Sequence, residues 1–146
     1  MKIQIKSRAE IEELILPENV AVISITDFGD VPVEFKNSPS HILRLAFDDV
    51  DGDIFIDESH KSREEIICEY HMLSDIQAQE IAEFINAVWD KVDTIICQCE
   101  HGQSRSAAIA AAIIEHRNRN GIAIFADDRY YPNKLIYRQV YKALTK

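Results

Sequence analysis

The chain has 146 residues, 47% of them apolar and 28% charged, which is the balance of an ordinary globular protein. Its formal net charge of −9 repels polyanions, so nucleic acid and an acidic membrane surface are poor candidates for the main partner. The longest nearly uncharged run, residues 107–114, is far shorter than the roughly 20 residues of a membrane span. We therefore expect one domain over residues 1–146 that acts on neither nucleic acid nor membrane.

The cellular compartment is suggested by the N-terminus and by the cysteines. Residues 1–14 contain acidic residues before any apolar core could form, so this segment does not resemble a signal peptide. Three cysteines, Cys68, Cys97 and Cys99, make a disulfide framework improbable. The sequence thus predicts a reducing, cytoplasmic location, with Cys68 and Cys97 as core residues.

The N-terminal segment predicts a strand followed by a short helix. Residues 2–5 alternate polar and apolar side chains, as a half-buried strand does. Ser7 and Glu10 have the spacing of a capping box, which indicates a helix through Ile15.

Two further strands are expected before the middle of the chain. Residues 20–25 are rich in β-branched side chains and residues 41–47 are mostly apolar, both typical of strands. Residues 26–40 contain glycine and two prolines and are interpreted as a loop. An acidic turn follows over residues 48–53, and the sequence predicts no element for residues 53–73.

The second half of the chain favours three helices and one strand. Residues 74–92 carry an apolar stripe at helical spacing, and Ser74 with Gln77 is placed to cap the start of this helix. Residues 94–97 are a short apolar strand. Residues 106–117 form an alanine-rich helix that Gly121 is expected to stop. Residues 133–144 form a last helix, capped by the asparagine at its start.

Strands that alternate with helices predict an α/β fold with a mainly parallel central sheet flanked by helices. In such sheets ligands bind beyond the carboxyl ends of the strands. The loop that follows strand 94–97 lies at this edge and is the candidate functional site.

This loop has the chemistry of a phosphate site joined to a nucleophile. It reads Cys99, Glu100, His101, Gly102, Gln103, Ser104, Arg105 and Ser106. The backbone N–H groups of a tight loop, backed by a helix N-terminus, bind anions, and Gly102 allows backbone angles that other residues avoid. Arg105 offers a planar fork of donors to two phosphate oxygens. The same positive surroundings favour the Cys99 thiolate, which is the nucleophilic form.

The loop resembles the Cys-x5-Arg-Ser motif of the protein tyrosine phosphatase superfamily, in particular its compact dual-specificity branch, and the resemblance covers residues 20–144. It implies a phosphotyrosine protein phosphatase-like fold and a dual-specificity-phosphatase-like catalytic domain. The implied reaction is hydrolysis of phosphate monoesters, phosphotyrosine above all and phosphoserine or phosphothreonine in addition, through a phosphocysteine. The implied substrate is a phosphorylated protein or a small phosphate ester, with no cofactor and no metal.

The resemblance also assigns roles to single residues. It implies that Cys99 is the nucleophile, that residues 100–104 form the backbone cradle, and that Arg105 binds the phosphoryl oxygens. Ser106 is implied to help the cysteine leave when water attacks. His101 has no second histidine or cysteine at ligand spacing nearby, so it is interpreted as a bystander rather than a metal ligand.

The family uses an aspartate on an upstream loop as its general acid. Alignment of strand 42–47 with the family pattern puts Asp49 at that position, with Asp48 second and Asp51 third. An aspartic acid shielded from water can keep a proton near neutral pH and give it to the leaving oxygen.

One departure from the family keeps an alternative open. Gln98 stands where many members have a histidine, and glutamine brings no titratable cation to stabilise the thiolate. The alternative is a weakly active, phosphate-binding pseudophosphatase module. A rhodanese-like sulfurtransferase and an arsenate reductase fit less well. The former lacks the arginine-serine ending, and the latter has its cysteine near the N-terminus with the aspartate after it.

Overall fold

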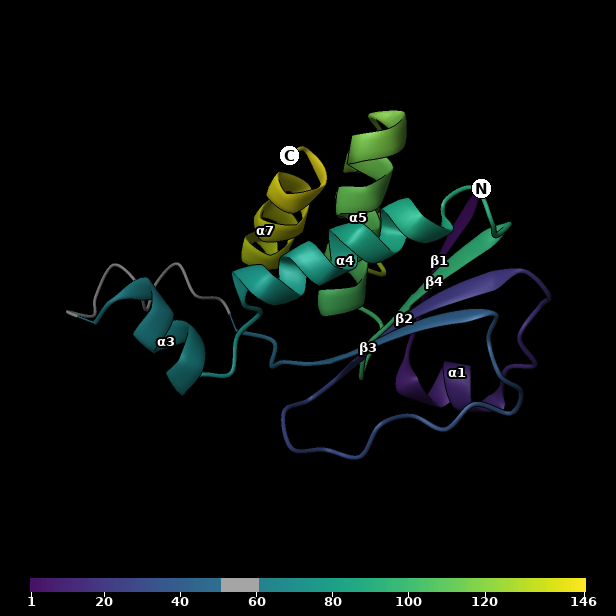
Figure 1. Cartoon of the computed structure of the whole chain (residues 1–146), viewed down its shortest axis with the longest axis horizontal. Helices are drawn as coiled ribbons and strands as arrows, with labels where there is room; N and C mark the ends of the chain where they lie inside the picture. Colours follow the sequence, from purple (N-terminus) through teal and green to yellow (C-terminus); the bar gives the residue numbers. More distant parts are fainter. Residues whose placement is uncertain (51–60) are drawn as a thin grey trace.

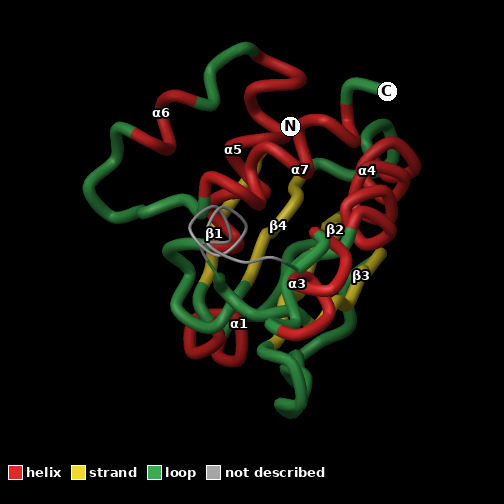
Figure 2. The backbone as a smooth tube through the Cα atoms, turned by 90° about the vertical axis from the view of Figure 1, so that its left-hand side faces the viewer, coloured by secondary structure: helices red, strands yellow, loops and turns green. Residues whose placement is uncertain are grey.

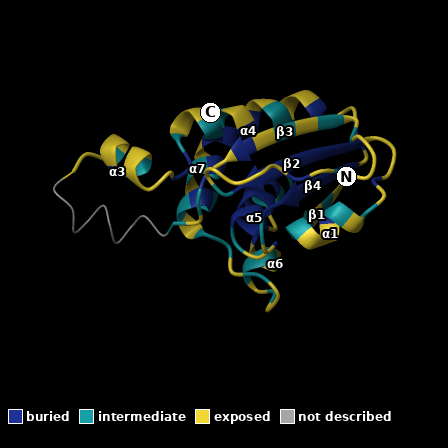
Figure 3. Ribbon diagram, turned by 90° about the horizontal axis from the view of Figure 1, so that it is seen from below, coloured by how far each residue is buried: buried dark blue, intermediate teal, exposed yellow. Residues whose placement is uncertain are grey.

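A four-stranded parallel sheet is the centre of the computed structural model, which describes residues 1–50 and 61–146. The strands are β1 (Lys2–Lys6), β2 (Val20–Thr26), β3 (His41–Ala46) and β4 (Thr94–Gln98). Their order in the sheet is β1-β4-β2-β3, and every neighbouring pair is parallel. The central strands β2 and β4 are buried along their whole length (Figure 3). The predicted α/β fold with a mainly parallel sheet is confirmed.

Helices cover both faces of this sheet (Figures 1 and 2). On one face, α4 (Asp75–Val88), α5 (Arg105–Asn118) and α7 (Lys134–Leu144) pack over side chains of β2 and β4. The other face is covered by α1 (Arg8–Glu13), whose Ile11 packs with β2 residues. In the described part of the chain, no helix is long and apolar enough to cross a membrane.

The helix starts that the sequence predicts are confirmed by their caps. Ser7 and Glu10 form the reciprocal capping box of α1, and Ser74 forms one with Gln77 at the start of α4. The helix ends are less well predicted. The sequence predicts that the first helix reaches Ile15, whereas α1 ends at Glu13. It predicts that the helix beginning at residue 74 reaches residue 92, whereas α4 ends at Val88. The capping residues mark where a helix begins more sharply than where it ends.

The prediction that Gly121 stops the alanine-rich helix is wrong. The left-handed residue that ends α5 is Arg119, with φ 57°, and its N–H donates to the carbonyl of Glu115. Gly121 instead allows a close approach, because a Cβ there would lie 2.7 Å from the carbonyl oxygen of Ala111. The short helix α6 (Ile122–Phe125), which the sequence did not predict, begins directly after it.

One helix lies in the segment for which no element was expected. It is α3 (Arg63–Glu69), whose first turn is capped by the Ser62 hydroxyl, which accepts from the N–H of Glu65. Apart from the buried Ile66, α3 is mostly exposed, which explains why it carries a weak apolar pattern (Figure 3). Cys68 lies on this helix and is exposed, so the prediction that it is a core residue is wrong. The third candidate acid, Asp51, lies outside the described residues.

Candidate active site

The loop between β4 and α5 lies at the carboxyl edge of the sheet, where the sequence predicts the site (Figure 1). Backbone hydrogen bonds connect this loop to the end of β1 and the start of α1. The N–H of Cys99 donates to the carbonyl of Lys6 at 3.3 Å, and the N–H of Arg8 donates to the carbonyl of Glu100 at 3.1 Å. The N-terminal strand therefore supports the loop directly.

Gly102 is required by the path of the loop. Its φ is +65°, a conformation that residues with a side chain rarely adopt. A Cβ at this position would lie 2.6 Å from the backbone nitrogen of Ser7. The neighbouring side chains of His101 and Gln103 are exposed, so these residues contribute mainly backbone.

The structure brings Cys99 and Ser106 together as the sequence predicts. The Sγ atom of Cys99, which is 2% exposed, lies 3.1 Å from the hydroxyl oxygen of the fully buried Ser106. That hydroxyl can donate to a thiolate. Cys97 lies in the core of β4, and burial raises the pKa of its thiol to about 12. Although Cys97 is close to Cys99 in the sequence, it therefore remains a protonated, unreactive thiol near neutral pH.

Arg105 is almost completely buried and is held by two acceptors. Its Nη1 atom lies 2.6 Å from Oδ1 of Asp27 and 2.7 Å from the carbonyl oxygen of Phe47. Its Nε atom is buried and has no acceptor among the described residues. Among the residues that the structure describes, no acceptor receives a hydrogen bond from the backbone N–H groups of residues 100–105 either. Unused donors of this kind, on a loop that opens a helix, are typical of an anion site.

The two candidate acids have different hydrogen-bond partners. Asp49 reaches the loop, where its Oδ1 atom accepts from the Ser104 hydroxyl at 2.9 Å. Asp48 instead accepts from the N–H of Phe28 at 2.9 Å, within the turn after β2. Asp49 is exposed, so the shielding from water that was expected at the acid position is not present in this structure.

Gln98 has a structural role that the sequence did not predict. It is buried, its Nε2 atom donates to the carbonyl oxygen of Cys99 at 3.0 Å, and its Oε1 atom accepts from the Ser24 hydroxyl. The glutamine therefore braces the loop against β2 without adding a charge beside the nucleophile.

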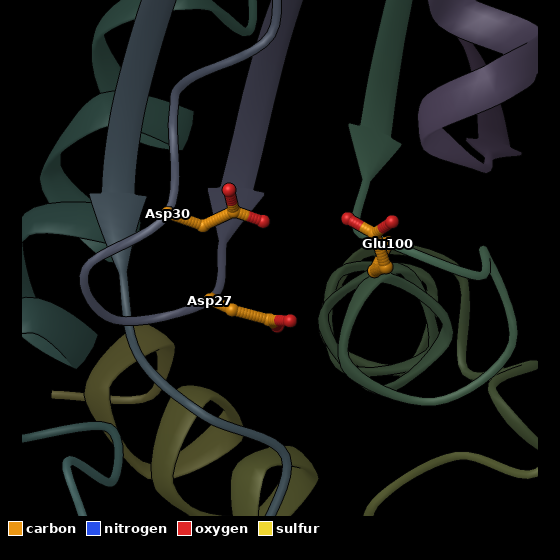
Figure 4. A group of neighbouring side chains, drawn as sticks. All are labelled: Asp27, Asp30 and Glu100. Atoms are coloured by element: carbon orange, nitrogen blue, oxygen red, sulfur yellow. The ribbon is translucent and has the colours of Figure 1, made fainter.

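Three carboxylates gather beside the loop and were not predicted as a group (Figure 4). They are Asp27 and Asp30 from the turn after β2, and Glu100 from the loop, with ligand oxygens within 4.8 Å of one another. Such a group could hold a cation, but Asp27 already binds Arg105, and Glu100 lies 3.9 Å from Arg8. The partnership of Asp27 could have been inferred from its place directly after a central strand, at the same edge as the loop.

Comparisons with known proteins bear on the fold. No protein-family model and no curated protein sequence matches the chain. Among solved structures, the crystal structure of PTPMT1 in complex with PI(5)P is similar with a TM-score of 0.59 at 13% identity, covering 99% of this chain and 90% of that one. A second crystal structure of PTPMT1 is similar with a TM-score of 0.55 at 15% identity and the same coverage. These two similarities show that the chain has the fold of PTPMT1.

Proposed function

We propose that the chain is a cysteine-dependent phosphatase that hydrolyses phosphate monoesters. The observation that carries this proposal is the set of unused donors beside Cys99, namely the buried Nε of Arg105 and the backbone N–H groups of residues 100–105. A phosphoryl group carries oxygens that such donors stabilise, and more strongly as charge develops during transfer. The phosphatase-type fold supports the proposal independently.

The first step transfers the phosphoryl group to sulfur. The Cys99 thiolate attacks phosphorus, so that an S–P bond forms while the bond from phosphorus to the leaving oxygen breaks. Asp49 gives its proton to that oxygen, which leaves as a neutral alcohol or phenol. Arg105 and the loop N–H groups stabilise the charge on the remaining phosphoryl oxygens.

The second step returns the enzyme to its starting state. Water attacks phosphorus, the S–P bond breaks, and Asp49 takes a proton from the water, which releases inorganic phosphate. The Ser106 hydroxyl, 3.1 Å from Sγ, donates to the sulfur as it becomes a thiolate again. These residues complete the cycle without a metal or a cofactor.

The proposed class is a protein-tyrosine or dual-specificity-type phosphatase acting in the cytoplasm. PTPMT1 has been crystallised in complex with PI(5)P, which supports a small phosphate ester as substrate beside a phosphorylated protein. A weakly active, phosphate-binding module is the second candidate. It is favoured by the uncharged Gln98 before the nucleophile and by the exposure of Asp49.

The two candidates are separated by turnover. The proposed enzyme hydrolyses nitrophenyl phosphate and a phosphotyrosine peptide, and Cys99→Ser abolishes both activities while the fold and the binding of inorganic phosphate persist. Arg105→Lys is expected to be severely impaired, because a point charge replaces the planar fork. Wild-type protein that binds phosphate but shows no turnover supports the binding module instead, and undiminished turnover by Cys99→Ser contradicts the covalent mechanism.

A further inference from the structure

Asn133 makes more contacts than its place at a helix start requires. Its Oδ1 atom caps α7 by accepting from the N–H of Ile136 at 3.1 Å. Capping needs only that oxygen. Yet the Nδ2 atom also donates to Oδ1 of Asp49 at 2.9 Å and to the carbonyl oxygen of Val50 at 3.1 Å. Both bonds lead to the turn that carries the proposed acid, so capping alone does not account for this side chain.

The backbone around Asn133 is fixed to the phosphate loop. The N–H of Tyr131 donates to the carbonyl of Gln103 at 2.8 Å, and the N–H of Asn133 donates to the carbonyl of Ser104 at 3.3 Å. The amide of Asn133 is therefore placed relative to the loop, not merely relative to α7. Through it, the acid turn after β3 is connected to the segment that already supports the nucleophile's loop.

The hydrogen bonds of Asp49 are unequally shared between its two oxygens. Oδ1 accepts both from the Ser104 hydroxyl and from Nδ2 of Asn133, each at 2.9 Å. No residue in the described ranges donates to Oδ2. A protonated carboxyl group carries its hydrogen on one oxygen, and an oxygen whose lone pairs receive two donors is the less favourable place for it. If the carboxyl group is protonated, Oδ2 is therefore the more favourable oxygen for its hydrogen.

From these contacts we propose that Asn133 is a positioning residue for Asp49, which holds the acid at the loop and leaves Oδ2 as the oxygen that donates the proton. This inference rests on the proposed phosphatase function. In this proposal Asn133 takes no part in the transfer itself and acts through its hydrogen bond to Asp49. The Ser104 hydroxyl also donates to Asp49, but it belongs to the phosphate loop itself. Asn133 holds Asp49 from a third segment of the chain.

The test uses variants that keep the cap and remove the donor. Asn133→Ser and Asn133→Asp both retain an oxygen that caps α7, so the melting temperature should change little. Turnover of a phosphotyrosine peptide should fall roughly tenfold in Asn133→Ser, the loss expected for one hydrogen bond to the reacting carboxyl group. Asn133→Asp should lose more, because a carboxylate cannot donate and repels Asp49. Nitrophenyl phosphate, whose leaving group needs little protonation, should be much less affected by either change.

A double-mutant cycle with Asp49→Asn then tests whether Asn133 affects turnover only through Asp49. If Asn133 acts only through the acid, Asn133→Ser costs nothing further in the Asp49→Asn background. A loss that persists there, a loss equal for both substrates, or an early melting transition in both variants overturns the inference while leaving the phosphatase function standing. Wild-type protein without turnover overturns both.

Discussion

Nη1 of Arg105 lies 2.6 Å from Oδ1 of Asp27, and this ion pair joins the turn after β2 to the start of α5. The arginine side chain is 5% exposed and the aspartate side chain 45%. A buried guanidinium is stable only when its charge and its N–H groups are paired. Asp27, with the Phe47 carbonyl, therefore fixes one end of the guanidinium and leaves Nε for a ligand.

Asp27→Ala should weaken the grip on phosphate. Without its counter-charge, Arg105 is held by the Phe47 carbonyl alone, and kcat/KM for a phosphate ester should fall about tenfold, as for the loss of one charge-assisted hydrogen bond. Asp30→Ala is the matched control, because Asp30 lies in the same turn and the same carboxylate group but does not contact Arg105. Steady-state kinetics on both variants check this prediction. Equal losses of kcat/KM in the two variants would contradict it and would attribute the effect to the net charge of the turn.

Asp49→Asn should slow reactions in proportion to the basicity of the leaving group. General acid catalysis is worth about 100- to 10,000-fold, and the full loss should be seen with a phosphotyrosine peptide or an alkyl phosphate. A nitrophenyl ester should lose far less. Asp48→Asn should show a small, uniform effect, since Asp48 binds the N–H of Phe28 rather than the loop. A steep dependence in Asp48→Asn, and none in Asp49→Asn, would exchange the two roles.

Ser106→Ala should make the second step rate-limiting. Its hydroxyl oxygen lies 3.1 Å from Sγ, and in the variant the departing thiolate lacks that hydrogen bond, which is worth about ten- to a hundredfold in rate. Rapid mixing with nitrophenyl phosphate should then show a burst of nitrophenol close to one per active site, followed by slow turnover. Absence of the burst with normal kcat would show that Ser106 only packs against Cys99.

Thiol-directed reagents should discriminate between the two neighbouring cysteines. Burial raises the pKa of Cys97 to about 12, so this group stays a protonated, unreactive thiol below that pH and becomes a thiolate only above it. Alkylation at neutral pH should inactivate the protein in step with labelling of Cys99, and inorganic phosphate should protect it. Peptide mass mapping checks the site, and inactivation that follows label on Cys97 would contradict the assignment.

The sequence predicted the fold well where local chemistry is strong. The β-branched run of β2, the capping boxes at Ser7 and Ser74, and the cap at Asn133 each depend on neighbours in the chain, and each is present. Gly121 was misread because its constraint is a contact with the Ala111 carbonyl, a residue ten positions away in the preceding helix, which no local pattern reports.

The site was predicted in part for the same reason. The Cys99–Arg105 loop and Ser106 are contiguous, so the sequence identifies them and the structure brings them together. Asp27 directly follows a central strand, which is the one sequence signal for its pairing with Arg105. Asn133 enters from a distant segment as the partner of Asp49, and no local pattern reports that contact. The catalytic role of Asp49 and the extent of the domain over residues 1–146 stay predictions.

In the proposed mechanism Cys99 carries the phosphoryl group during turnover. Wild-type protein, mixed with excess nitrophenyl phosphate and quenched in acid within one turnover, should yield a Cys99 peptide heavier by one phosphoryl group. Ser106→Ala should accumulate more of this species, and Cys99→Ser should yield none on any cysteine. Turnover that proceeds with no phosphoryl group on Cys99 in either the wild-type protein or Ser106→Ala would contradict the account.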